Sequence, residues 1–147
     1  MQKQKLKSAV LLCAAAALAG ALVPASASAE SPAQARVVAV DCFSKAQIRP
    51  GDFLLACGDG NNRLTALRWS TWGRSSAVGS GLDAVNDCLP YCAAGKFHTF
   101  PVTVRLDRPE TWQKHPGLQH FTRLRLIYTD NTPPRLQQRE VTYKLWD

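Results

Sequence analysis

Helical patterning is missing from this sequence of 147 residues. No segment places apolar residues at the three- and four-residue intervals of an amphipathic helix over ten or more positions. Instead, several short segments alternate apolar and polar residues, which is typical of strands with one face in solvent. The missing helical period argues against a helix-rich fold and favours the all-β class.

Residues with catalytic or metal-binding chemistry are also few. The only histidines are His98, His115 and His120, and no Gly-x-Ser-x-Gly sequence marks a hydrolase nucleophile. The interval between His115 and His120 does not match a zinc-binding helix, and the turn at residues 59–62 lacks the alternating ligands and closing glutamate of a calcium loop. We therefore predict no metal and no other cofactor. A non-enzymatic protein is favoured, with a small extracellular hydrolase as an alternative.

One long apolar run lies near the amino terminus. Three lysines precede residues 9–23, and small residues then continue to Ala29. A charged head, an apolar core of about fifteen residues and a small-residue cleavage pattern are typical of a secretory signal peptide, because a membrane span needs roughly twenty apolar residues. We expect a signal peptide at residues 1–29, cleavage near Ala29, secretion, and no transmembrane segment in the mature chain.

The mature chain has the size of one domain. Removal of residues 1–29, which contain three lysines, would leave 118 residues and lower the formal net charge from +7 to +4. Residues 30–36 are small and polar and predict a flexible leader, so the folded domain is expected at residues 37–147. A mild positive charge permits attraction to anionic surfaces. Secretion disfavours nucleic acid as a partner.

Four cysteines remain after cleavage: Cys42, Cys57, Cys88 and Cys92. An even count in a secreted chain predicts two disulfides, for which three connectivities are possible. Folding a strand at residues 37–43 onto a strand at residues 53–57 would place Cys42 opposite Cys57. We therefore favour the pairs Cys42–Cys57 and Cys88–Cys92. The cysteine spacings match no zinc pattern.

The strand pattern is clearest at both ends of the domain. A turn at residues 58–62 joins apolar segments at residues 53–57 and 65–69 and predicts a hairpin. Later strands are predicted at residues 97–107, 121–129 and 138–147. Residues 73–96 are rich in glycine and serine and are expected to form a long connection, with one helical turn near residues 82–88. We predict an antiparallel β-sandwich or partial barrel of about six to seven strands.

Basic residues occupy the polar positions of the later strands. These residues are Arg105, Arg123, Arg125 and Lys144. If the strands are neighbours, the side chains could bind an anionic polysaccharide, a teichoic-acid-like polymer or a phospholipid headgroup through charge-assisted hydrogen bonds. Alternating charge is also expected on any solvent-exposed sheet face. The four residues are therefore a candidate anion-binding site.

Two tryptophans form a second candidate site. Trp72 lies at the edge of the glycine-rich segment, and Trp146 lies near the basic positions. Aromatic rings beside a polar loop can stack on sugars, whereas rings that cap the end of a core are the alternative. Trp72 and Trp146 are therefore candidates for ligand stacking, while Trp69 is assigned to the core.

Several sequence segments resemble a group of small uncharacterised secreted proteins of actinobacteria. They are IRP at residues 48–50, LACGDG at 55–60, LRWS-x-WG at 67–73 and DC-x-P-x-CA-x-G at 87–95. The resemblance implies secretion and a disulfide-bonded β fold, and it supplies no catalytic residue. A weaker resemblance is to the secreted subtilisin inhibitors of the same bacteria. Those inhibitors have a longer second disulfide loop, and Cys88 and Cys92 are too close in sequence to form it.

Together these patterns predict a secreted, non-enzymatic binding or structural module, acting at the cell wall or on anionic polymers. The alternative partner is an extracellular serine protease, which would be inhibited through an exposed loop at residues 73–81.

Overall fold

A computed structural model describes residues 36–146 of the chain. The predicted signal peptide at residues 1–29 and the leader up to residue 35 lie outside the described residues. The described part is all-β, and its one helical element is a short 3-10 turn, Cys92–Ala94. The strands are β1 (Val37–Val40), β2 (Ala46–Gln47), β3 (Phe53–Leu54), β4 (Asn62–Trp72), β5 (Ser76–Asn86), β6 (Phe97–Thr111), β7 (Gln119–Tyr128) and β8 (Glu140–Lys144).

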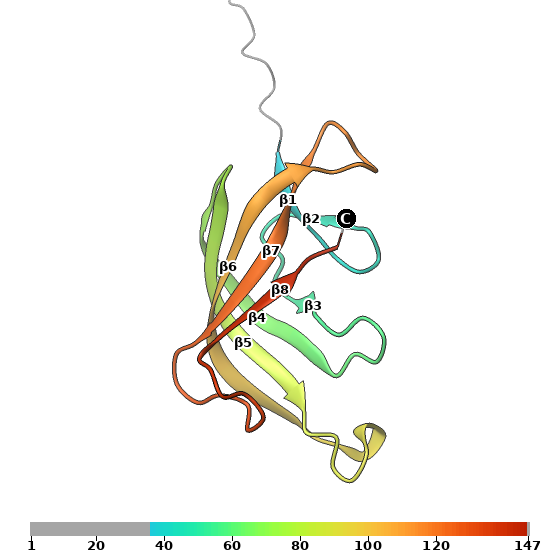
Figure 1. Ribbon diagram of the computed structural model, residues 1–147, viewed down its shortest axis with the longest axis vertical. Helices are drawn as coiled ribbons and strands as arrows, with labels where there is room; N and C mark the ends of the chain where they lie inside the picture. Colours follow the sequence, from blue (N-terminus) through green and yellow to red (C-terminus); the bar gives the residue numbers. More distant parts are fainter. Residues whose placement is uncertain (1–35, 147) are drawn as a thin grey trace, which may run out of the picture. The chain divides into compact units, whose positions relative to one another are not determined.

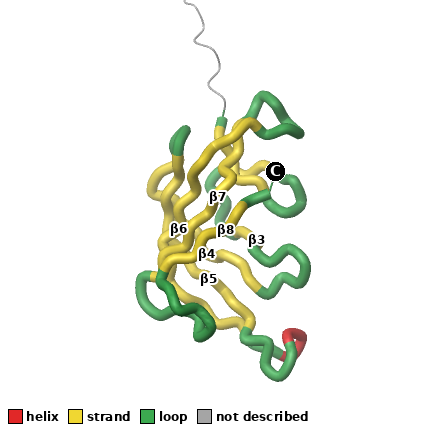
Figure 2. The backbone as a smooth tube through the Cα atoms, viewed as in Figure 1, coloured by secondary structure: helices red, strands yellow, loops and turns green. Residues whose placement is uncertain are grey.

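The eight strands form one curled sheet in the order β2-β1-β7-β6-β5-β4-β3, with β8 also paired to β7 (Figure 1, Figure 2). This half-barrel with two disulfides confirms the predicted fold class, in its partial-barrel form. One pair departs from the antiparallel expectation, because β1 runs parallel to β7 through Val37 and Gln119. The sheet is therefore mixed.

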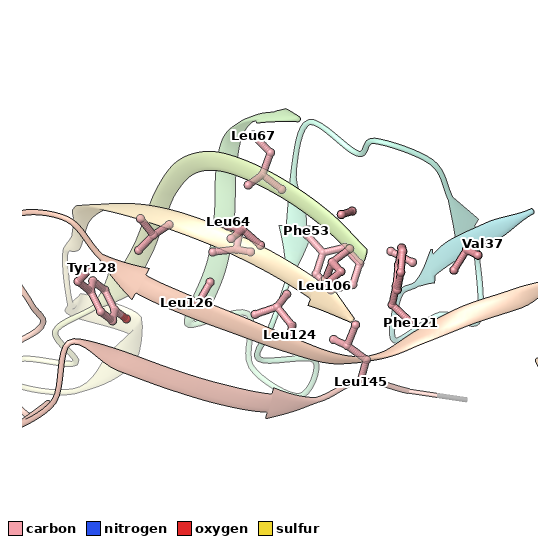
Figure 3. Packing of buried hydrophobic residues seen from close by; sticks show 14 residues of the cluster. Val37, Phe53, Leu64, Leu67, Leu106, Phe121, Leu124, Leu126, Tyr128 and Leu145 are labelled. Atoms are coloured by element: carbon pink, nitrogen blue, oxygen red, sulfur yellow. The ribbon is translucent and has the colours of Figure 1, made fainter. Parts of the chain in front are cut away.

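The core lies on the concave face of the sheet. The strongest alternation comes from β6 and β7, whose inward residues are Val102, Val104, Leu106, Leu124, Leu126 and Tyr128. Phe53 of β3 and Leu145, which follows β8, pack onto the same cluster (Figure 3). The opposite faces of β6 and β7 are consequently left for polar side chains.

Both predicted disulfides are present, Cys42–Cys57 and Cys88–Cys92. The strand geometry behind the first prediction is different, however. β1 pairs with β2 and β7, while β3 pairs with β4 at the far end of the strand order. Cys42 and Cys57 lie in the loops that follow β1 and β3, so the bond links two loops that backbone pairing leaves separate.

The prediction of a long connection at residues 73–96 is wrong. β5 occupies Ser76–Asn86 and pairs with β6 along its whole length. The exposed loop expected at residues 73–81 and the helical turn near residues 82–88 are therefore wrong as well. The alternating pattern of β5 is not visible in the sequence, because Gly79 and Gly81 stand at positions where apolar side chains would mark the inward face. A Cβ on Gly79 would lie 2.7 Å from the carbonyl oxygen of Arg68. Glycine allows β4, which bulges here, to approach β5 closely.

We expect Gly79→Ala to lower the free energy of unfolding by about 1–3 kcal/mol, because its methyl group would overlap the β4 backbone. Gly58→Ala is the matched control, since a Cβ at Gly58 meets nothing within 4 Å. Urea unfolding followed by tryptophan fluorescence measures both. Equal stability of the two variants would contradict the close approach of β4 and β5.

Candidate anion-binding site

The sheet brings the four predicted cations together on its outer face. The register pairs Arg105 of β6 with Arg125 of β7, and Arg123 of β7 with Lys144 of β8. Their neighbours in sequence, such as Leu106 and Leu124, point into the core. Arg105, Arg123, Arg125 and Lys144 are called the basic face below.

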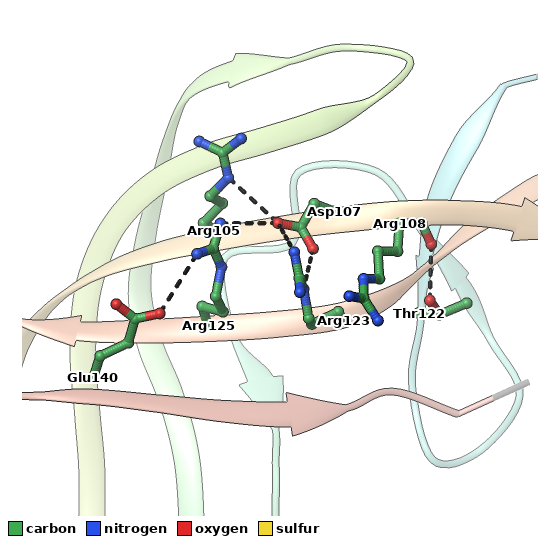
Figure 4. Close-up of polar contacts among 7 residues, drawn as sticks. All are labelled: Arg105, Asp107, Arg108, Thr122, Arg123, Arg125 and Glu140. Atoms are coloured by element: carbon green, nitrogen blue, oxygen red, sulfur yellow. Dashed lines mark hydrogen bonds and ion pairs between the residues drawn. The ribbon is translucent and has the colours of Figure 1, made fainter. Parts of the chain in front are cut away.

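Asp107 lies among the three arginines of the basic face, whose side chains gather around its carboxylate (Figure 4). Arg123 donates two hydrogen bonds to the Asp107 carboxylate, from Nε at 2.5 Å and Nη2 at 2.9 Å. Arg125 Nη2 donates a third at 3.0 Å, and Arg105 Nε lies 3.4 Å away. These arginines cover Asp107, which is only 7% exposed. Hydrogen bonds from Arg123 lower the pKa of Asp107, and its charge keeps three guanidinium groups close together.

Positive charge remains in excess after these contacts. Glu140 adds one longer ion pair, with its Oε1 at 3.5 Å from Arg125 Nη1. Lys144 forms no ion pair with any carboxylate of residues 36–146. Two carboxylates thus face four cations. The arrangement can attract an anion while the arginine side chains are held in fixed orientations.

A pocket of about 420 Å³ adjoins the basic face. Arg123 and Lys144 line it together with Arg108, and Glu110 is the one carboxylate in its lining. The remaining polar lining residues are His120, Thr122, Thr142 and Tyr143. The pocket therefore carries three cations against one acidic group.

Arg108 is the member of this site that alternation could not predict. Arg108 lies an even number of residues from Val102, Val104 and Leu106, so strict alternation along the strand would direct its side chain into the core. Instead its backbone is left-handed, with φ of 54°, and the register skips it between Asp107 and Pro109. Thr122 Oγ1 donates a hydrogen bond of 2.8 Å to the Arg108 carbonyl. In Figure 4 the Arg108 guanidinium lies beside that of Arg123.

The segment around Arg108 also corrects a sequence interpretation. The strand predicted at residues 97–107 ends too early, because β6 continues to Thr111. Only the left-handed residue interrupts it. His120 was grouped with possible catalytic residues, yet it is 2% exposed and its Nδ1 has no hydrogen-bond partner. Both residues reach the pocket through this irregular part of β6 and β7.

The predicted stacking tryptophans are occupied by protein contacts. A bulge in β4 places Trp72 on the same side as Trp69, with ring centroids 4.7 Å apart. Trp72 Nε1 also donates to the Val37 carbonyl at 2.9 Å. Trp146 packs on Phe53 with centroids 6.0 Å apart. Both rings cover the core, and these contacts give no support to a sugar-stacking role.

The possible catalytic parts do not converge among residues 36–146. His98 bonds to Asp87 at 2.9 Å, which lowers the pKa of Asp87 to about 2. His115 instead stacks near Trp112, and no described serine is hydrogen-bonded to a histidine. The described residues include no group of three side chains able to hold a metal. Nor does any helix in this part of the chain have the length and apolar character to cross a membrane.

One further acidic group is structural. The Asp83 side chain is fully buried and accepts hydrogen bonds from Tyr128 Oη at 2.6 Å and Asn62 Nδ2 at 2.5 Å. Burial raises the pKa of Asp83 and of Tyr128. These two hydrogen bonds join β4, β5 and β7 inside the core, away from the basic face.

Comparison with known proteins assigns no role to this site. The chain shows no match to a protein-family model, to a curated protein or to a solved structure. The resemblances to secreted actinobacterial proteins and to subtilisin inhibitors therefore stay predictions.

We expect Asp107→Asn to lower the free energy of unfolding at pH 7 by about 1–3 kcal/mol, because an amide cannot neutralise the adjacent arginines. The folded-state pKa of Asp107 lies below its ordinary value of 3.8. Its stabilisation is therefore present above that value and is lost as the pH falls through the lowered pKa. Urea unfolding of the wild type and the variant should show a difference that shrinks on acidification.

The control is Asp130→Asn, which changes the same charge at an exposed position without an ion pair among the described residues. It should have little effect at any pH. An Asp107→Asn penalty that stays constant from neutral to acidic pH would show that Asp107 does not stabilise the fold through its charge.

Proposed function

We propose that this protein is a secreted, non-enzymatic module that binds anionic polymers at the cell wall through its basic face. The observation that carries the proposal is the convergence of Arg105, Arg123, Arg125 and Lys144 on three adjacent strands. A scattered set of the same residues would bind no polymer in a defined position.

The spacing of the cations suits an extended polyanion. Neighbouring strands lie about 4.8 Å apart, so a chain crossing β6, β7 and β8 meets a cation on each strand. Asp107 holds two of the arginines by hydrogen bonds. Binding then costs little side-chain entropy, because these guanidinium groups are already oriented.

The alternatives have less support. A protease inhibitor needs an exposed reactive loop, and the loop expected for that role at residues 73–81 is largely strand β5. A hydrolase needs a converging nucleophile, base and acid. Among the described histidines, His98 bonds to Asp87, whereas His115 and His120 both pack against Trp112. Secretion itself rests on the signal-peptide pattern of residues 1–29. The two disulfides are compatible with an extracellular location.

Co-sedimentation of the purified mature chain with anionic cell-wall polymer tests the proposal. We expect binding at low salt that weakens as salt rises, because exposed charges are screened within about 10 Å at 0.1 M salt. The double variant Arg105→Gln/Lys144→Gln should bind about tenfold more weakly, since it removes two cations and leaves Arg123 and Arg125 on Asp107.

The control is Lys45→Gln/Arg135→Gln, which removes the same charge from exposed loop positions. It should retain most of the binding. No binding at low salt, or an equal loss in both double variants, would refute a role for the basic face.

A further inference from the structure

We propose that the pocket beside the basic face binds the phosphate group of a polyol phosphate, the repeating unit of a phosphodiester polymer. This inference rests on the proposed function and names the chemical class of its ligand. It assigns the phosphate to Arg108, Arg123 and Lys144, and a neighbouring ligand hydroxyl to Glu110.

The pocket has an unbalanced charge that an anion would complete. Arg123 and Lys144 are direct cross-strand partners, and like charges in that position repel each other. Asp107 engages Nε and Nη2 of Arg123 from the side of β6. No carboxylate of residues 36–146 forms an ion pair with Arg108 or Lys144. An anion in the pocket would relieve the repulsion among all three cations.

The arrangement of the cations favours a tetrahedral group. Arg108, Arg123 and Lys144 come from three different strands, β6, β7 and β8, and all three line the pocket. A carboxylate presents two oxygens in one plane, and the Asp107 carboxylate already uses both of them for Arg123 and Arg125. A phosphate presents oxygens in several directions and can engage all three cations at once.

The left-handed conformation of Arg108 determines where its side chain lies. Its φ of 54° is one of five positive values among the non-glycine residues described, and Arg108 is the one of the five that lines the pocket. This conformation turns the Arg108 side chain away from the core and places it beside Arg123. The adjacent His120 ring is buried with an unsatisfied Nδ1, which carries a further stability cost in the same wall of the pocket.

The rest of the lining suits a hydroxylated ligand. A volume of about 420 Å³ exceeds that of a phosphate ion and leaves room for a short polyol. Glu110 and Thr142 offer oxygen atoms that accept hydrogen bonds from ligand hydroxyl groups. The Glu110 carboxylate would also repel a second anion. The pocket is thus suited to one phosphate with an adjoining polyol.

The test is a titration of the isotopically labelled mature chain with glycerol 3-phosphate, inorganic phosphate, sulfate and acetate at equal ionic strength, followed by NMR. We expect saturable shifts at Thr122, Thr142 and Leu145, with glycerol 3-phosphate binding more tightly than phosphate or sulfate, and acetate binding most weakly. Arg108→Gln and, independently, Lys144→Gln should each weaken glycerol 3-phosphate binding about tenfold. Arg105→Gln, on the basic face outside the pocket, should change it less than about twofold.

The outcomes separate this inference from the function on which it rests. Polymer binding without saturable glycerol 3-phosphate binding would overturn the pocket assignment and leave the basic face intact. Acetate or sulfate binding as tightly as glycerol 3-phosphate would overturn the ligand class. An equal effect of Arg105→Gln and Arg108→Gln would overturn the pocket assignment. If neither polymer nor small anion binds the wild type, the proposed function fails as well. Dispersed spectra of each variant would show that it remains folded.

Discussion

The register between β6 and β7 determines both the core and the outer surface of this protein. The same pairing that brings Leu106 against Leu124 inside the sheet brings Asp107 against Arg123 outside it. A shift of one residue would send the apolar set to solvent and the charged set into the core. The position of Asp107 opposite Arg123 is therefore a consequence of core packing.

The cluster is only partly neutralised, and the proposed anion-binding role rests on this excess of positive charge. Asp107 holds three arginines, and Glu140 touches one of them. Towards β8 the balance changes, because Arg108, Arg123 and Lys144 share a pocket with a single glutamate. The fold keeps like charges on facing positions, with a pocket next to them.

Sequence patterns predicted the regular parts of the structure and missed the irregular ones. The strands around Val104, Leu126 and Tyr143 could be predicted because their side chains alternate, and so could the basic face that alternates with them. β5 was missed because Gly79 and Gly81 carry no side chain to alternate, and their role depends on how closely β4 approaches. Arg108 was missed because its left-handed backbone reverses the parity. The parallel pairing of β1 with β7 depends on tertiary contacts that no local pattern contains.

The location of bound anion is the most direct test of this account. A crystal of the mature chain soaked in selenate, whose selenium atom scatters anomalously, would show where a tetrahedral anion binds. We predict an anomalous peak bounded by Arg108, Arg123 and Lys144, and loss of that peak in Arg108→Gln. An empty pocket in a crystal that holds selenate at other surface positions would contradict it.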